Sequence, residues 1–166
     1  MHRLIAAIAL LLATAAGPAV ASDKADAMAT VNQFIDGFNK GDVPKALAAC
    51  ASPAFIIDEF PPYAWSGPNA CSDWANDFDA NARKKALTDP VVKLGKPRHV
   101  DVAGDRAYVV VPANYKYKVK GKATTQAGST LTVALQRTAA GWRITAWSWS
   151  TGLHRPARAR DERPRA

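Results

Sequence analysis

Asp58 is the ionisable side chain whose surroundings in the sequence best suit chemistry. It directly follows the apolar run Phe55-Ile56-Ile57. Partial burial behind such a run raises the pKa of a carboxyl group and suits it to act as a general base. The alternative is an acid at a strand end, in water or paired with a lysine or arginine. The neighbouring Glu59 takes the opposite face by strand alternation, which favours solvent exposure.

Aromatic side chains are the second candidate feature, because together they can line a pocket with flat apolar walls and a few polar tips. The residues expected to line it are Phe34, Tyr63, Trp65, Tyr115, Tyr117, Trp147 and Trp149. Trp74 and Phe78 lie on the stripe of a predicted helix, so core packing is the simpler interpretation for them. His99 and Asp101 share a strand face, which fits an acid-oriented imidazole and also a hydrophilic outer face.

Motifs for several other chemistries are absent from the sequence. It has no Gly-rich phosphate loop, nucleophile elbow, dinucleotide fingerprint or zinc-ligand spacing. No cofactor and no metal site are therefore expected. The aromatic residues do not interleave regularly with basic ones, as a nucleic-acid platform requires. No nucleic-acid partner is expected either.

The two ends of the chain differ in composition from its middle. Residues 1–21 combine a basic start, an apolar run and the small-x-small site Ala19-Val20-Ala21, which predicts a secretory signal peptide and export to the periplasm or the medium. The apolar run is shorter than the roughly 20 residues of a membrane span. Residues 153–166 hold five arginines, two acids and two prolines without an aromatic residue, which predicts a basic disordered tail. Residues 22–152 are then a single domain.

Cys50 and Cys71 are the two cysteines of the chain. Export favours a disulfide between them. A loop of this length would stabilise the folded state by about 3 kcal/mol in the chain-entropy description. Two buried thiols, or one reactive thiol, are the alternatives.

Hydrophobic periodicity predicts three helices followed by long strands. One helix covers 25–40, a short second helix begins after Asp42 and carries Cys50 on its buried face, and a third opens at Ser66-Gly67-Pro68. The strands are predicted over 54–60, 91–102, 106–119, 124–138 and 142–151. This order predicts an α+β domain, with helices packed on one face of a strongly curved, mostly antiparallel sheet and a cone-shaped interior.

Three segments, FIDGFNKGD, KALAACASPAFIID and GWRITAWSWS, resemble the NTF2-like superfamily in its SnoaL-like or ketosteroid-isomerase-like branch. The resemblance in element order covers residues 25–152. It implies the same cone of three N-terminal helices on a curved sheet. It also implies a homodimer through the exposed sheet face, an arrangement frequent in this superfamily.

The catalytic pattern of the ketosteroid isomerases transfers only in part. There an Asp at the end of the first strand is the general base, and Asp58 matches that position. The oxyanion hole is built from a Tyr and a protonated Asp, and these positions fall on Phe34 and on the Thr132-Val133-Ala134 region. Neither Phe34 nor Val133 can donate a hydrogen bond from its side chain. An enolate formed by Asp58 would lack its usual electrostatic stabilisation.

We therefore expect an exported, non-catalytic domain that binds a small apolar or amphipathic ligand, or a protein partner. The alternative is a small-molecule lyase, isomerase or hydrolase with Asp58 as its base and Tyr63, Tyr115 or His99 as the donor. That alternative requires Asp58 to face a cavity with a donor within reach.

Overall fold

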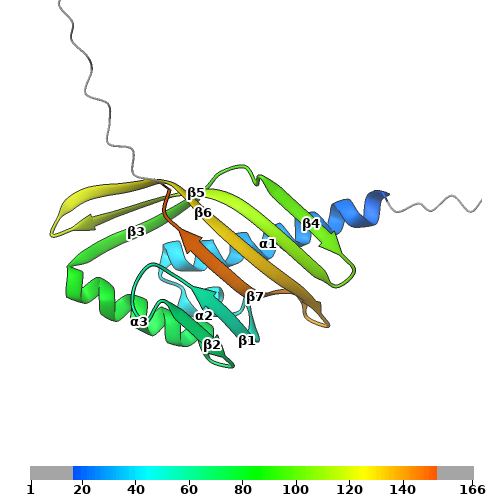
Figure 1. The fold of residues 1–166 in the computed structure, drawn as a ribbon, viewed down its shortest axis with the longest axis horizontal. Coiled ribbons are helices and arrows are strands. Elements are labelled where there is room, and N and C mark those ends of the chain that lie inside the picture. The colour runs from blue at the N-terminus through cyan, green and yellow to red at the C-terminus, as the bar shows by residue number, and fades with distance from the viewer. Residues whose placement is uncertain (1–16, 153–166) are drawn as a thin grey trace, which may run out of the picture.

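Three helices and a seven-stranded sheet form two layers in the part of the chain that the structure describes (Figure 1). The computed structural model describes residues 17–152. The helices are α1 (Gly17–Lys40), α2 (Val43–Leu47) and α3 (Ala70–Lys85). The strands are β1 (Cys50–Ile57), β2 (Ala64–Gly67), β3 (Leu87–Leu94), β4 (His99–Ala103), β5 (Arg106–Val119), β6 (Lys122–Thr138) and β7 (Gly141–Ser150). Figure 1 shows α1 passing behind the sheet, while α3 lies beside β1 and β2.

The strand order is β2-β1-β7-β6-β5-β3, and β4 also pairs with β5. All pairings are antiparallel except that of β1 with β7, which is parallel. Register shifts interrupt the ladders between Ala113 and Tyr115 and between Ala134 and Leu135. Such bulges bend a sheet and increase its twist. The predicted α+β architecture, with helices packed on a curved and mostly antiparallel sheet, is confirmed.

The core lies between the inner face of the sheet and the helices. Apolar residues alternate with outward-facing ones along β5, β6 and β7, as expected for a sheet with one covered face. The largest fully buried apolar side chains are Val31, Ile56, Val109, Val111, Leu131, Val133, Leu135 and Ile144. Asn39 adds a polar tie from α1 to β3, because its side-chain amide both donates to the carbonyl of Val92 and accepts from the Val92 N–H.

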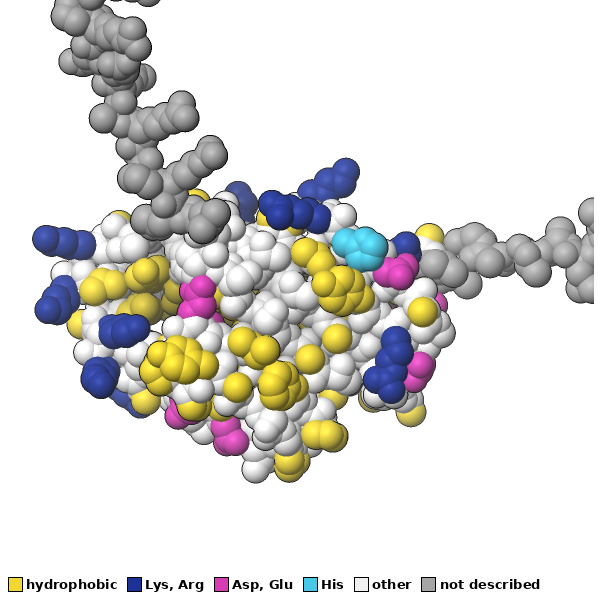
Figure 2. Space-filling view, in the orientation of Figure 1, with side chains coloured by type: hydrophobic (Ala, Val, Ile, Leu, Met, Phe, Trp, Pro, Cys, Tyr) yellow, Lys and Arg dark blue, Asp and Glu magenta, His cyan; other side chains and the backbone are white. Residues whose placement is uncertain are grey.

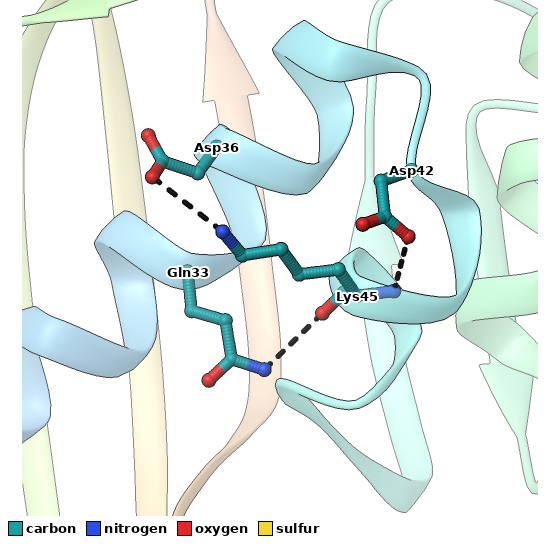
Figure 3. A network of polar contacts seen from close by, with 4 residues as sticks. All are labelled: Gln33, Asp36, Asp42 and Lys45. Carbon is teal, nitrogen blue, oxygen red and sulfur yellow. Dashed lines mark hydrogen bonds and ion pairs between the residues drawn. The ribbon is translucent and has the colours of Figure 1, made fainter.

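A small polar network fixes α2 against α1 (Figure 3). The carboxylate of Asp42 accepts from the backbone N–H of Lys45 at 3.1 Å, which caps the first turn of α2. The Lys45 ammonium lies 3.7 Å from a carboxylate oxygen of Asp36, and the Gln33 amide donates to the Lys45 carbonyl at 3.2 Å. Gly37 lies on α1 between Gln33 and Lys40, and a side chain there would overlap the backbone of Ala46 on α2.

The disulfide between Cys50 and Cys71 is present, but it joins other elements than we expected. Cys50 is the first residue of β1 and does not lie on α2, because α2 ends at Leu47. The bridge therefore ties the start of β1 to the first turn of α3. Helix α3 itself begins at Ala70 rather than at Ser66, since β2 extends to Gly67.

The strand predicted over 91–102 is in fact two strands. It breaks at Gly95-Lys96-Pro97, after which β4 begins at His99. Proline has no N–H to give to a ladder, so a continuous strand is disfavoured there. The chain stays beside β5 through single bonds, from the Gly95 N–H to the Pro112 carbonyl and from the Arg98 N–H to the Val110 carbonyl.

The predicted tail and most of the predicted leader lie outside the described residues, so both remain predictions. Helix α1 begins at Gly17, within the predicted signal peptide of residues 1–21. Between residues 17 and 152, no helix is both long enough and apolar enough to cross a membrane.

Candidate functional site

A pocket of about 600 Å³ lies between α1, α3 and the inner face of the sheet. This volume falls in the range of about 300–1,000 Å³ that small-molecule sites occupy. Its wall is mainly aromatic and aliphatic, and it comes from α1, α3, β3, β5, β6, β7 and the turn after β1. The charged groups of the wall are the carboxyls of Asp58 and Glu59 and the ammonium groups of Lys84, Lys85 and Lys120.

Asp58 lines this pocket at the point where β1 has just ended. One carboxylate oxygen, Oδ2, accepts from the indole Nε1 of Trp74 at 2.9 Å, and Oδ1 accepts from the backbone N–H of Glu59 at 2.7 Å. Burial raises the pKa of the Asp58 carboxyl above its usual range. The two hydrogen bonds favour the charged form and offset part of that rise. The result is a carboxyl held by two hydrogen bonds in the wall of a largely apolar pocket.

Tyr115 and Trp147 also line the pocket, and each contributes a buried donor. Within residues 17–152, the Tyr115 hydroxyl and the Trp147 indole nitrogen find no hydrogen-bond partner. Burial raises the pKa of the Tyr115 phenol far above its usual value, and the charges of Tyr117 and Asp58 add to that rise. Tyr115 therefore keeps its proton at neutral pH and can donate a hydrogen bond. Leaving such a donor unsatisfied costs about 1–3 kcal/mol.

Five of the seven predicted aromatic pocket residues line this one cavity. They are Phe34, Tyr115, Tyr117, Trp147 and Trp149. Their rings contact one another directly, with the Phe34 and Trp147 centroids 5.8 Å apart and the Tyr115 and Tyr117 centroids 4.7 Å apart. The structure thus brings together residues from α1, β5 and β7, and Phe34 on α1 is more than a hundred positions from Trp147 and Trp149 on β7.

The other two predicted aromatic residues do not line the pocket. Tyr63 is 57% exposed and sits at positive φ in the turn between β1 and β2, where its carbonyl accepts from the Asp58 N–H. Trp65 is buried on β2 behind Phe60, and its indole N–H donates to Asp77 on α3 at 2.8 Å. Both residues therefore shape the turn and the helix around the pocket rather than its wall.

Trp74 and Glu59 also belong to the pocket wall, a role that was not predicted for them from the sequence. Trp74 shares the stripe of α3, as expected, yet its ring also stands against Trp147 at 4.9 Å between centroids and its N–H holds Asp58. Glu59 is exposed to solvent, as predicted, although β1 ends at Ile57 and strand alternation does not reach it. Its carboxylate accepts from Gln126 at 3.0 Å and from the Thr151 N–H, and it belongs to the pocket wall.

His99 and Asp101 lie on β4, outside the pocket wall, and the His99 ring packs 5.9 Å from that of Tyr108. No group of three or more His, Cys, Asp or Glu side chains within the described residues could hold a metal ion. Asp58, Tyr115 and Trp147 bring a carboxyl, a phenol hydroxyl and an indole N–H to the wall of one pocket.

Solved structures of similar fold are numerous. An NTF2-like protein with a cystatin-like fold from Novosphingobium aromaticivorans matches with a TM-score of 0.66 and 16% identity, over 84% of this chain and 88% of its own. An NTF2-like superfamily protein from Salmonella enterica serovar Typhimurium matches with a TM-score of 0.68 and 16% identity, over 84% and 98%. A ketosteroid isomerase-like protein from Erwinia carotovora atroseptica matches with a TM-score of 0.61 and 18% identity, over 78% and 95%. No curated protein matches the sequence significantly.

The element order, the curved sheet and the pocket between sheet and helices define an α+β protein of the NTF2-like class. The sequence match narrows this class further. The SnoaL-like domain family matches residues 27–153, which is most of the chain, and the chain belongs to that family.

Proposed function

We propose that this domain binds a small amphipathic molecule in the pocket between α1, α3 and the sheet. The observation that carries the proposal is the pair of buried donors, the Tyr115 hydroxyl and the Trp147 indole N–H. They line the same pocket as the Asp58 carboxyl and have no hydrogen-bond partner among residues 17–152. Buried polar groups in folded proteins are nearly always hydrogen-bonded. A ligand with an apolar body and one oxygen acceptor would satisfy these donors while it covers the aromatic wall.

Proton transfer by Asp58 is a second candidate function of the same pocket. The raised pKa of a carboxyl among aromatic rings favours it as a base, and donors aimed at a developing oxyanion are usually the largest catalytic contribution. The family's donor positions fall on Phe34 and Val133, which cannot donate. Tyr115 and Trp147 supply the missing donors from other strands, which supports a lyase, isomerase or hydrolase more than the sequence alone did.

One set of variants tests both functions on the molecule that the protein retains from its own source, detected by native mass spectrometry. We expect Tyr115→Phe to weaken retention by about tenfold, because it removes one buried hydrogen bond worth about 1.4 kcal/mol. We expect Asp58→Asn to keep retention. If the pocket is catalytic, the same substitution abolishes the deuterium that the bound molecule acquires in heavy water.

Tyr108→Phe is the matched control, because Tyr108 is 47% exposed on the opposite face of the sheet. It should leave retention unchanged. Equal retention by the Tyr115→Phe and wild-type proteins would contradict the binding proposal. Deuterium uptake that persists in Asp58→Asn would remove Asp58 as the base and leave binding standing.

Export is part of the same proposal. The signal-like residues 1–21 and the Cys50–Cys71 disulfide support an exported location, periplasmic or secreted, because oxidising compartments preserve disulfides. An exported pocket would meet its ligand outside the cytoplasm.

The outer face of the sheet supports a homodimer. Cross-strand pairing places Phe55, Ala146, Ala134 and Tyr108 in one row, and Ile57, Ser148, Thr132 and Val110 in the next. None of these eight side chains is charged, and Phe55 and Ile57 are 44% and 46% exposed. Figure 2 shows hydrophobic and uncharged side chains across the middle of this face, with Lys and Arg at its edges. Contiguous exposed apolar surface of this kind commonly marks an interaction site.

We expect the purified domain to sediment as a dimer and Phe55→Glu to convert it to a monomer, because a buried unpaired carboxylate is costly at an interface. Val43→Glu is the control, since Val43 is similarly exposed at 48% but lies on α2. A wild-type protein that sediments as a monomer at high concentration would remove the dimer proposal.

A further inference from the structure

Three lysines form a second polar end of the pocket, away from Asp58. Lys84 and Lys85 lie in the last turn of α3, and Lys120 lies in the turn between β5 and β6. The backbone N–H of Lys120 donates to the carbonyl of Ala86 at 2.9 Å, which holds that turn directly against the end of α3. All three lysines belong to the pocket wall. We call this group the lysine mouth.

The lysine mouth is far from the polar groups at the inner end. Trp74, which holds Asp58, and Lys84 are ten residues apart on α3, which corresponds to about 15 Å along a helix. Tyr115 lies on β5, and Lys120 comes directly after the end of that strand at Val119. Apolar side chains line the wall between these ends, among them Phe38, Phe78, Val92 and Val119. The pocket therefore runs from a donor pair, along an apolar wall, to a cluster of positive charge.

The positive charge of the lysine mouth is not balanced by neighbouring carboxylates of the described residues. None of Lys84, Lys85 and Lys120 forms an ion pair within the described residues. The acids nearby already pair with other cations: Asp89 lies 2.9 Å from the Lys118 ammonium, and Asp79 pairs with Arg83. Figure 2 shows several Lys and Arg side chains around hydrophobic ones at the end of the molecule where the β5–β6 hairpin lies.

Stabilisation of the α3 dipole is the competing explanation for Lys84 and Lys85, because cations suit the last turn of a helix. It does not explain Lys120, which comes from the sheet layer and reaches the same opening. Two separate elements thus present ammonium groups at one mouth of an apolar pocket.

We infer that the ligand is an elongated anionic amphipath, whose carboxylate or other anionic group pairs with the lysine mouth while its apolar body runs inward toward Tyr115 and Trp147. This inference rests on the proposed binding function and adds the ligand class. The inner donors take a neutral oxygen acceptor, and the mouth takes the charge. A neutral molecule of the same length would form no ion pair with the three exposed ammonium groups.

Dodecanoate and dodecanol are matched probes, because they share an apolar chain and differ in charge. We expect the full mature protein to bind dodecanoate at least about tenfold more tightly than dodecanol in calorimetric titration, with the difference shrinking at high salt. We expect Lys84→Gln, Lys85→Gln and Lys120→Gln together to lose about tenfold for dodecanoate and nothing for dodecanol.

The control is Lys40→Gln, Lys93→Gln and Lys96→Gln together, which removes the same charge at positions outside the pocket wall. It should keep wild-type affinity for both probes. Equal affinity for dodecanoate and dodecanol, or equal losses in the two triple variants, would overturn the anionic class. If neither probe binds while Tyr115→Phe still reduces retention of the native molecule, the ligand class is wrong and the pocket function stands.

Discussion

Replacing both Cys50 and Cys71 with serine is expected to lower the free energy of unfolding by about 3 kcal/mol, because the unfolded chain regains the freedom of a closed 21-residue loop. The loop encloses β1, β2 and the turn that carries Asp58. Its closure therefore stabilises the fold and one wall of the pocket together. The loss would be a large fraction of the 5–15 kcal/mol that is typical of a domain.

Urea unfolding of the oxidised and reduced proteins measures this effect. A reductant should shift the wild-type midpoint to that of the Cys50→Ser, Cys71→Ser variant and should leave the variant itself unchanged. Ala51→Ser is a matched control, because it adds a hydroxyl to the partly buried residue beside Cys50 without breaking the bridge. A double variant as stable as the wild type would show that the bridge contributes nothing.

The architecture was predictable because hydrophobic period and turn residues agree over most of the chain. The bounds of β5 are those we predicted, since an alternating apolar run ends at the tight Lys120-Gly121 turn. Strand β3 was harder to predict. It starts at Leu87, before the Asp89-Pro90 pair that we expected to precede the strand, because a register shift between Thr88 and Val91 accommodates that pair. A local breaker can thus be absorbed by a bulge, and sequence pattern alone does not distinguish the two outcomes.

The residues of the candidate site were easier to predict from the sequence than the side chains that contact them. The position of Asp58 after an apolar strand suggested a buried carboxyl. The hydrogen bond from Trp74 to Asp58 depends on how α3 packs against β1. No local sequence pattern predicts that packing. The same holds for Tyr115 and Trp147, which line one pocket because β5 and β7 both face its interior. The family's hydrogen-bond donors are absent at Phe34 and Val133. Their absence therefore did not exclude donors at other positions of the chain.

Gly37 is the position where α1 and α2 leave no room for a side chain. A Cβ atom placed there would lie 2.5 Å from the backbone nitrogen of Ala46 and 2.9 Å from its Cα. Real Cβ atoms do not approach other heavy atoms so closely, and two of the three nearest atoms are backbone, so rotation of a side chain cannot relieve the overlap. Helix α2 would have to move away from α1, and the contacts among Gln33, Asp36 and Lys45 would be lost with it.

We expect Gly37→Ala to destabilise the domain by about 3 kcal/mol, as overpacking a tight contact does. In an exposed helix interior the same substitution would stabilise by about 1 kcal/mol, so the sign of the effect reports the close approach. Denaturant unfolding measures it. Asn32→Ala, on the exposed side of the same helix, is the control and should be nearly neutral.

Adding Ala46→Gly to Gly37→Ala separates backbone from side-chain crowding. It removes the Ala46 methyl group, one of the three closest atoms, but not the backbone nitrogen or the Cα. We therefore expect the double variant to remain as unstable as Gly37→Ala or less stable, since glycine in α2 costs helix propensity. Full rescue would mean that the methyl group alone sets the distance between the helices. Because Phe34 and Phe38 stand on either side of Gly37 and line the pocket, a displaced α2 that also altered ligand retention would link this contact to the shape of the site.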